Sequence, residues 1–306
     1  MAQALMAIVA IYVFVLLGFG AKQIFGTQLH ERTLTIVSIY LLQPFLTIWG
    51  LTRKPFDYSS LTLPLSYLAL TFLALGIVLF FGYLRFSDPR DRSLLSMNAT
   101  VGNTGNIGLP IVLAIYGEEA LYHASLIAIA NTFFVYIIGV YFYSRGQFSL
   151  KESLLNIVKL PIIWAAIFAL LWSMGGVAIP SAFDHSLKMG AYAALVLQLI
   201  LLGTYLCAIH AKEINPALLS WSVGGKLLFV PLLSLLLIPL LPFSILTKTV
   251  LFLQLCVPMA VNNVSLAALY DCKPEQVAAA VFVSSLLFAA FLPLYLYLAH
   301  HFIGGI

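Results

Sequence analysis

Residues 98–110 read Asn-Ala-Thr-Val-Gly-Asn-Thr-Gly-Asn-Ile-Gly-Leu-Pro, a polar and glycine-rich stretch between two long apolar runs. Gly105 and Gly108 lower helix propensity, and Pro110 removes an N–H donor and clashes with the preceding turn, so a straight helix is not expected here. In hydrocarbon, freed backbone groups are tolerated only where protein or a water-filled cavity satisfies them. Secondary transporters place substrate or ion sites at such broken membrane helices. The alternative is a structural helix with a proline kink.

Hydrophobic residues make up 62% of this 306-residue chain, charged residues only 8%, and the mean hydropathy is +1.04. Because soluble proteins carry roughly 25% charged residues, this composition indicates a polytopic membrane protein surrounded by the lipid bilayer. At about 20 residues per crossing, the chain has room for roughly ten spans and for no sizeable soluble domain. The net charge of +4 comes from loop lysines and arginines, which indicates membrane topology rather than a nucleic-acid partner.

Ten apolar segments can be delimited, and they predict an all-α polytopic membrane protein with ten transmembrane helices. The N-terminus lacks a basic region and a small-residue cleavage site, so we expect the first segment to be a span and not a removed signal. The segments cover approximately residues 4–25, 33–51, 61–84, 93–117, 120–143, 155–175, 186–208, 216–240, 246–270 and 275–299.

Lysine and arginine are distributed unequally between the two sets of loops. Ten follow the odd-numbered segments, namely Lys22, Arg32, Arg85, Arg90, Arg92, Arg145, Lys151, Lys159, Lys212 and Lys273. The other face holds four, Arg53, Lys54, Lys188 and Lys248. The positive-inside rule then predicts a multi-pass protein of the cell membrane, inner or plasma, with both termini outside the cytoplasm.

The chain contains a weak internal repeat. Residues 113–131 resemble residues 267–285, with Tyr116 matched to Tyr270 at an offset of 154. Because each half holds five spans, an odd number, the second copy must enter the membrane in the opposite sense. The alternative is chance similarity between two apolar stretches. The two inverted five-helix repeats predicted in this way are residues 1–150 and 151–306.

The repeat predicts that span 9 is interrupted near its middle, as span 4 is. Pro258 lies within this segment, and Asn262 and Asn263 follow it within two turns. Paired interrupted segments at corresponding places in two halves are the best sequence indication of a transport site. We therefore expect spans 4 and 9 to contribute the site together.

Helix halves that begin near Pro110 and Pro258 would present free N–H groups and positive dipole ends, which suit a carboxylate. Asparagine side chains both donate and accept hydrogen bonds, so they can bind the oxygens of an anion or coordinate a cation. Besides the two prolines, the candidate ligand contacts are Asn103, Asn106, Asn262 and Asn263, which could instead satisfy the broken backbone. Asn98 lies a turn or more away and is assigned a structural role.

Lys226 is the one charged residue that these segments place deep inside a span. A lysine at that depth costs about 2.5 kcal/mol or more on insertion scales, so it is a functional candidate. It could neutralise carbonyl groups at the crossing, attract an anion or lose a proton during transport; the alternative is a lysine that snorkels to the interface. Further polar candidates in apolar surroundings are Gln43, Asn131, Ser284 and Ser285, which could equally be interhelical hydrogen-bond partners.

The sequence shows no pattern for a metal, a cofactor or catalysis. The three cysteines lack metal-ligand spacing, and no histidine pairs with an acid at such spacing. All eleven aspartates and glutamates lie in loops or at span ends, so an intramembrane carboxylate that binds a proton or sodium has no obvious carrier. Asp271, just past span 9, is the nearest. We expect no cofactor, no metal site and no enzymatic activity.

Four motifs resemble the auxin efflux carrier family, which includes plant PIN-formed carriers and bacterial permeases proposed to carry malate or malonate. They are Leu-Gln-Pro-Phe-Leu at 42–46, Asn-x-Gly-Asn-x-Gly-Leu-Pro at 103–110, the segment 226–231, and Val-Pro-Met-Ala-Val-Asn at 257–262. The likeness extends over essentially the whole chain, but the long cytosolic loop of many plant carriers is missing, which favours a prokaryotic member.

The resemblance implies a ten-span fold like that of bile-acid sodium symporters and sodium/proton antiporters. In such a fold, spans 4 and 9 cross at their unwound points. Spans 3 to 5 and 8 to 10 form a moving transport domain, and spans 1, 2, 6 and 7 form a scaffold that usually dimerises.

Our leading hypothesis is a secondary carrier that moves a small organic anion, such as a dicarboxylate or an auxin-like acid, by alternating access. The coupling ion would be a proton or sodium, and the protein would be a homodimer. The runner-up is a cation-coupled symporter of a bile-acid-like or other organic solute. Other classes are a channel, a sensor with the same binding site, and an intramembrane enzyme, for which no buried catalytic pair is found. Flux that saturates with substrate distinguishes a carrier from a channel.

Overall fold

The computed structural model describes residues 2–52, 61–145, 155, 158–176, 179–208 and 214–304 of the chain. The predicted boundary between the two repeats, at residues 150 and 151, lies outside these ranges. Four residues of the charge comparison also lie outside them, namely Arg53, Lys54, Lys151 and Lys212.

The described residues are almost entirely helical, as the composition predicts. In chain order the α-helices are α1 (Ala2–Phe25), α2 (Glu31–Ile36), α3 (Gln43–Leu51), α4 (Thr62–Arg85), α5 (Pro89–Thr100), α6 (Leu109–Phe134), α7 (Val140–Arg145), α9 (Pro161–Met174), α10 (Ser181–Ala208), α11 (Pro216–Gly224), α12 (Val230–Leu237), α13 (Ile245–Cys256), α14 (Asn262–Leu269) and α15 (Pro274–Phe302). Short π-helical turns occupy Val37–Leu42, Thr104–Gly108, Val135–Gly139 and Gly225–Phe229.

Six helical stretches of the described residues are long and apolar enough to cross a membrane. They are Glu31–Gly50, Thr62–Arg85, Tyr122–Ser144, Ser181–Cys207, Pro216–Leu240 and Pro274–Phe302. Three of these stretches continue through a π-helical turn, so helices with separate labels, such as α2 and α3, form one continuous helix. The fold is therefore that of a multi-pass, all-helical membrane protein.

Local sequence signals explain where several helices begin and end. The side chain of Asp88 accepts from the N–H of Arg90, and Pro89 takes the first helical position, so α5 begins at Pro89 rather than near residue 93 as expected. Asn215 caps α11 in the same way, ahead of Pro216. Within α6, Gly117 has a φ of 79°, which favours glycine, and it divides this helix into two.

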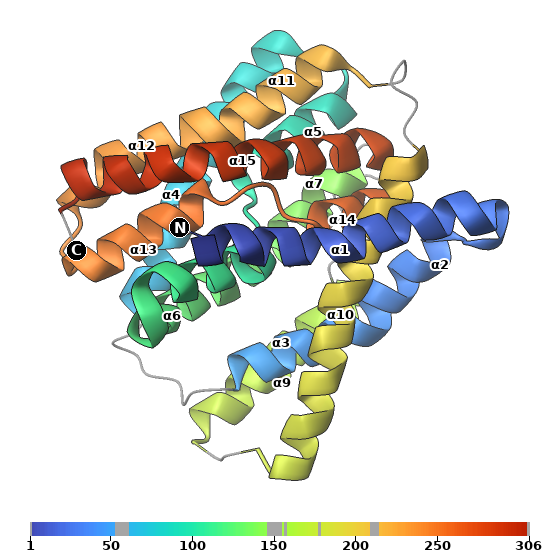
Figure 1. Ribbon diagram of the computed structural model, residues 1–306, viewed down its shortest axis with the longest axis horizontal. Helices are drawn as coiled ribbons and strands as arrows, with labels where there is room; N and C mark the ends of the chain where they lie inside the picture. The colour runs from blue at the N-terminus through green and yellow to red at the C-terminus, as the bar shows by residue number, and fades with distance from the viewer. Residues whose placement is uncertain are drawn as a thin grey trace.

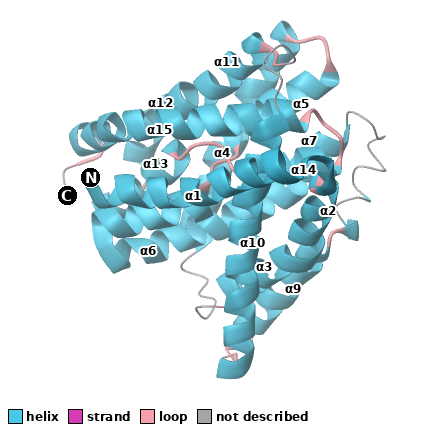
Figure 2. Cartoon of the chain, turned by 45° about the vertical axis from the view of Figure 1, so that its right-hand side comes forward, coloured by secondary structure: helices cyan, strands magenta, loops and turns pink. Residues whose placement is uncertain are grey.

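The helices pack in two groups (Figures 1 and 2). In the first group, α10 packs on α1 and α3, and α3 packs on α9. In the second group, α4 packs on α5 and α6, α11 on α5, α13 on α6, and α14 on α15. The groups meet where α10 contacts α15, α1 contacts α6 and α2 contacts α14. Figure 1 shows α3, α9 and one end of α10 projecting from the body that the second group forms.

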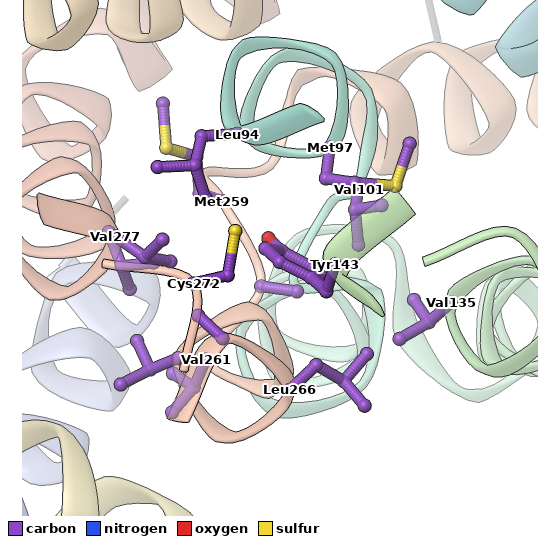
Figure 3. Packing of buried hydrophobic residues seen from close by; sticks show 14 of the residues in the cluster. Leu94, Met97, Val101, Val135, Tyr143, Met259, Val261, Leu266, Cys272 and Val277 are labelled. Carbon is purple, nitrogen blue, oxygen red and sulfur yellow. The ribbon is translucent and has the colours of Figure 1, made fainter. Parts of the chain in front are cut away.

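Buried apolar side chains fill the second group. Figure 3 shows one cluster, in which Leu94 and Met97 of α5 gather with Tyr143 of α7, Leu266 of α14 and Met259. Each of these side chains except Tyr143 is purely apolar or a thioether, so the cluster is dominated by dispersion and hydrophobic contact. The polar groups described below are embedded in surroundings of this kind.

An ion-pair cluster joins the start of α5 to the start of α15. The Lys273 Nζ lies 2.9 Å from Asp88 Oδ2 and 2.5 Å from Asp91 Oδ1. Partial burial acts to raise the pKa of Asp88, but the hydrogen bond from Lys273 and the N–H of Arg90 outweigh it and lower that pKa below its ordinary value. Burial likewise acts against the charge of Lys273, yet the two carboxylates raise its pKa. The cluster therefore ties the interrupted segment after Asp88 to the last long helix.

Replacing Lys273 by Met is expected to lower the free energy of unfolding by about 1 kcal/mol at neutral pH, because Asp91 is left partly buried without its partner. The stabilisation from a carboxylate with a lowered pKa exists above its ordinary pKa and is lost as pH falls through the lowered value. The difference from the wild type should therefore shrink in acid.

Thermal unfolding of both proteins in detergent at neutral and acidic pH measures this effect. Lys159→Met is the matched control, because Lys159 is exposed and contacts no acid among the described residues. Equal unfolding temperatures for the two variants at neutral pH would show that the ion-pair cluster contributes nothing.

Candidate functional site

Two interrupted helices cross each other at the centre of the second group. The chain leaves α5 after Thr100 and leaves α13 after Cys256, and the only β-bridge among the described residues pairs Gly102 with Met259 in antiparallel fashion. The N–H of Asn103 donates to the carbonyl of Pro258 at 2.8 Å. In return, the N–H of Ala260 donates to the carbonyl of Val101 at 3.2 Å. The helices are thus interrupted in the two stretches where the sequence predicts it, and each interruption satisfies the other.

Side chains from the two neighbouring helices complete the hydrogen bonding of the crossing. Asn131 Nδ2 donates to the carbonyl of Gly102 at 2.8 Å and to Thr104 Oγ1 at 3.0 Å, while its Oδ1 accepts from the Tyr67 hydroxyl at 2.9 Å. Asn131, predicted as a candidate ligand contact, is therefore engaged on both amide atoms. A ligand that contacted it would have to displace one of these bonds.

On the Met259 side of the bridge, Ser284 of α15 plays the part that Asn131 plays on the Gly102 side. Its Oγ accepts from the N–H of Met259 at 3.2 Å and donates to the carbonyl of Val281 at 2.9 Å. The neighbouring Ser285 donates to the same carbonyl at 2.8 Å. Both serines, predicted as polar candidates, thus act as hydrogen-bond partners inside the protein in this structure.

The helices resume at positions that differ from the expected ones. The segment after the first interruption restarts at Thr104 in a π-helical turn, with Asn103 Oδ1 accepting from the N–H of Asn106 at 3.3 Å. Pro110 therefore lies inside helical structure and does not mark its start. After the second interruption α14 begins at Asn262, and Pro258 belongs to the extended strand of the bridge. The expectation of helix starts near the two prolines is wrong by six residues at Pro110 and by four residues at Pro258.

The four candidate asparagines fall into two pairs. Asn106 and Asn262 are half-buried, and the structure records no hydrogen bond from either side chain to another described residue. Asn103 and Asn263 are 5% and 0% exposed, and Asn103 Nδ2 and Asn263 Oδ1 lack a hydrogen-bond partner. The first pair is therefore partly accessible, and the second pair is enclosed by the protein.

Lys226 is fully buried in the π-helical turn Gly225–Phe229 and does not snorkel to an interface. Its Nζ donates to the carbonyl of Leu255 at 3.2 Å, in the last turn of α13. A Cβ on Gly102 would lie 3.0 Å from this Nζ, so the ammonium is packed directly against the crossing. A cation at the C-terminal end of a helix is favoured by the helix dipole and by the carbonyls that end there.

Gln254 is a polar residue at the crossing that our sequence analysis missed. It is fully buried, and neither Nε2 nor Oε1 has a hydrogen-bond partner among the described residues. Its side-chain amide rests on Gly108, where a Cβ would lie 2.2 Å from Oε1. A glutamine four residues before Pro258 in an otherwise apolar run was the available signal.

Gln43 lies apart from this set. It is 1% exposed, lies beside the hydroxyl of Tyr136 in the second group, and has an unpartnered Nε2. No hydrogen bond joins it to the crossing within the described part of the chain. Gln43 thus marks a contact between the two groups of helices rather than a member of the crossing.

The described residues contain no group of three or more His, Cys, Asp or Glu side chains that could hold a metal ion. The polar groups of the crossing are carboxamides, hydroxyls, backbone N–H and C=O groups and one ammonium. Such groups can bind the oxygens of an anion or, through their own oxygens, a weakly held monovalent cation.

Comparisons with known proteins indicate membrane transport. A family model described as "Membrane transport protein" matches residues 3–296. A curated relative, an uncharacterized transporter of Methanocaldococcus jannaschii, is 25% identical over 291 residues, which cover 91% of this chain and 93% of the relative. The family match extends over both interrupted helices and agrees with the resemblance drawn from the sequence motifs.

Replacing Asn131 by Ala is expected to lower the free energy of unfolding by about 2 kcal/mol, because the Gly102 carbonyl and the Tyr67 hydroxyl lose their partner in a dry environment. Chemical or thermal unfolding in detergent measures the loss.

Thr132→Ala is the matched control for Asn131→Ala, because Thr132 donates only to the carbonyl of Ala128 in its own helix. Equal stability of these two variants would contradict the role of Asn131 at the bridge.

Proposed function

Because this chain belongs to the family of membrane transport proteins, we propose that it is a secondary carrier that moves a small organic anion across the membrane by alternating access. The protein is a membrane transporter and not an enzyme. The proposal concerns its substrate class, such as a dicarboxylate or an auxin-like acid, and the way the substrate is moved.

The observation that carries the proposal is the crossing itself. Two interrupted helices are joined by the Gly102–Met259 bridge, and beside it Asn106 and Asn262 have carboxamides that no described residue engages. Each carboxamide can donate two hydrogen bonds to the oxygens of a carboxylate. The first N–H groups of each helix that restarts there lack intrahelical partners and add a partial positive charge. We therefore assign Asn106 and Asn262 as the principal substrate contacts.

We propose that Asn103 and Lys226 add hydrogen-bond donors and positive potential at the crossing. Asn103 Nδ2 is an unpartnered donor, and the Lys226 ammonium uses one of its three hydrogens on Leu255. Since the eleven acids of the chain all fall outside the interiors of the ten predicted spans, we infer that the crossing has an excess of donors over negative charge. This balance favours an anionic substrate over a cationic one.

Alternating access in this proposal is a movement of the second group of helices against the first. Helices occupy all ten predicted segments over the described residues, which supports ten spans; we propose that these spans form two inverted repeats. Each ion pair among the described residues joins helices of one group: Lys22 to Glu31 in the first, and Lys273 to Asp88 and Asp91 in the second. Such pairs would stiffen each group without tying the two together.

The remaining expectations from the sequence belong to the same proposal. We place the carrier in the cell membrane with both termini outside the cytoplasm, on the distribution of lysine and arginine. We assign the scaffold to the first group, with α1, α2, α3, α9 and α10, and propose that it forms the contact of a homodimer. Exposed aromatic side chains on α9, such as Trp164 and Phe168, fit a surface in contact with lipid or a second copy.

Replacing both Asn106 and Asn262 by Ala is expected to abolish stabilisation by the substrate and saturable flux, because the carboxylate loses its two free carboxamide partners. Both are measured on purified protein with a panel of mono- and dicarboxylates and auxin-like acids, by thermal shift and after reconstitution into liposomes.

Gln28→Ala is the matched control for the double variant, since it removes an exposed carboxamide in the turn after α1, distant in the sequence from both interrupted helices. Unchanged acid binding in the double variant, with the unfolding temperature of the ligand-free protein preserved, would show that the site assignment is wrong.

Lys226→Met is expected to weaken binding of the organic acid about tenfold or more, because it removes the buried positive charge beside the crossing. Lys188→Met, which removes an exposed lysine on α10, should leave the affinity unchanged. Titration of both variants by thermal shift compares the two. An affinity in Lys226→Met equal to that of the wild type would exclude an attraction between Lys226 and the substrate.

A further inference from the structure

Three arginines lie close together in the sequence where α4 ends and α5 begins. Residues 83–92 read Tyr-Leu-Arg-Phe-Ser-Asp-Pro-Arg-Asp-Arg, with the arginines at positions 85, 90 and 92. The segment follows an odd-numbered span, on the face that the charge distribution predicts to be cytoplasmic. The positive-inside rule accounts for basic residues on that face, but it does not determine what each guanidinium group contacts.

The two acids of this segment are already engaged by Lys273, in the ion-pair cluster described above. No ion pair among the described residues contains an arginine. Partial burial acts to raise the pKa of Asp88, and Arg90 lies close enough to be among the groups that lower it. Arg85 and Arg92 are therefore the two cations of the segment that no carboxylate of the described chain neutralises.

Arg92 is held in a fixed orientation at the end of α4. Its guanidinium carbon lies 4.6 Å from the centroid of the Tyr83 ring, and its Nη2 donates to the carbonyl of Ser87 at 2.5 Å. A Cβ on Gly82 would lie 3.9 Å from Arg92 Cγ, so the stem of the side chain runs along the last turn of α4. Its Nε is enclosed without a hydrogen-bond partner among the described residues. Of the five N–H groups, the three that are neither enclosed nor used on Ser87 remain for an acceptor outside the chain.

The outward face of α4 just before these arginines is apolar. The exposed fractions are 62% for Phe80, 46% for Phe81, 56% for Tyr83 and 71% for Leu84. This helix is one of the stretches long and apolar enough to cross a membrane, and it ends at Arg85, which is itself exposed. Aromatic side chains beside basic residues at the end of a span are typical of the level of the lipid head groups.

The fold does not require arginines in front of an interrupted helix. The other interrupted helix is preceded by the loop between α12 and α13, in which residues 241–244 read Leu-Pro-Phe-Ser and carry no charge. The nearest cation to that loop in the sequence, Lys248, donates to the carbonyl of Pro239 at 2.8 Å and so satisfies a backbone group of the chain. The arginines before α5 are thus not explained by the start of the helix alone.

We propose that Arg85 and Arg92 bind the phosphate of an anionic phospholipid, whose acyl chains lie against the exposed face of α4. A guanidinium presents paired N–H donors that match two phosphate oxygens, and it is more weakly hydrated than an ammonium. The unneutralised charge favours a lipid with a net negative head group, such as phosphatidylglycerol, over a zwitterionic lipid. The exposed apolar face favours a lipid over a free phosphate ion.

The lipid site does not depend on the proposed function, because it concerns neither the crossing nor the transported solute. It is nonetheless connected to the crossing through α5, which begins at Pro89 and ends at Thr100, where the first interruption starts. A lipid bound to Arg92 therefore contacts the same short helix that leads into the crossing.

Lipid retention by the purified protein tests the proposal. Native mass spectrometry of the protein from micelles with equal amounts of phosphatidylglycerol and phosphatidylcholine measures which lipid is kept, and thermal shift measures affinity. We expect selective retention of phosphatidylglycerol, and an unfolding temperature raised by about 3 °C at about ten times the dissociation constant. Arg85→Gln and Arg92→Gln should each weaken binding of this lipid about fivefold, and the double variant about 25-fold.

Arg90→Gln is the matched control, because it removes the same charge from the same segment at a residue that lies beside Asp88. Its affinity for phosphatidylglycerol should stay within about twofold of the wild-type value, because exposed charges are screened by salt. If Arg90→Gln loses as much affinity as Arg92→Gln, only the net charge of the segment matters and the assigned site is wrong. The proposal also fails if the double variant, with an unchanged unfolding temperature in phosphatidylcholine, binds phosphatidylglycerol as tightly as the wild type.

Two measurements on the wild type do not depend on any variant folding. Equal retention of phosphatidylglycerol and phosphatidylcholine would overturn the proposal. Inorganic phosphate in large molar excess should neither displace phosphatidylglycerol nor raise the unfolding temperature, because it has no acyl chains to cover the exposed face of α4. Displacement of the lipid by phosphate alone would show that the site takes a free anion, and the assignment to a lipid would be wrong.

Discussion

The hydrogen bonding of an interrupted backbone inside an apolar body is the constraint on which the rest of this structure depends. Each unsatisfied peptide group in hydrocarbon costs several kcal/mol, so a single broken helix in such surroundings would be strongly destabilised. The chain meets this constraint by breaking two helices at the same place and pairing Gly102 with Met259. Asn131 and Ser284 then satisfy the outward-facing groups of the bridge. Neither interruption is stable without the other, and neither is complete without the helices on either side.

This constraint divides the polar residues of the crossing by role. The carboxamide of Asn131 is fully engaged by the Gly102 carbonyl and by the hydroxyls of Thr104 and Tyr67, and the ammonium of Lys226 is bound to the carbonyl of Leu255 at the end of α13. The side chains of Asn106, Asn262 and Gln254 form no hydrogen bond to a described residue, because the bridge already satisfies the backbone beside them. Polar side chains that a fold does not need for its own hydrogen bonding, at a place where burial makes them costly, are the ones available for a ligand.

The sequence predicts a large part of this arrangement, and the missing part has identifiable physical reasons. Apolar runs locate the helices, and the two proline-containing polar stretches locate the interruptions, because glycine, proline and asparagine in hydrocarbon are incompatible with an uninterrupted rod. The restart of the helix could not be predicted from Pro110, since proline is tolerated throughout a first turn, and here a π-helical turn precedes it. Which asparagines satisfy the backbone and which remain free for a ligand also depends on contacts between distant segments, such as that of Asn131 with Gly102. No local sequence pattern encodes these contacts.

Two glycines explain why charge and amide groups can approach the crossing so closely. A Cβ on Gly102 would meet Val257 Cγ2 at 2.9 Å and the ammonium of Lys226 at 3.0 Å, and a Cβ on Gly108 would collide with the amide of Gln254. The space that these glycines leave is filled in part by polar groups, although apolar filling would stabilise the protein more. The crossing therefore keeps a fully buried lysine and a fully buried, unpaired glutamine amide, at a cost in stability. A requirement other than folding must maintain them, and binding of a charged solute is the requirement that both their chemistry and their position fit.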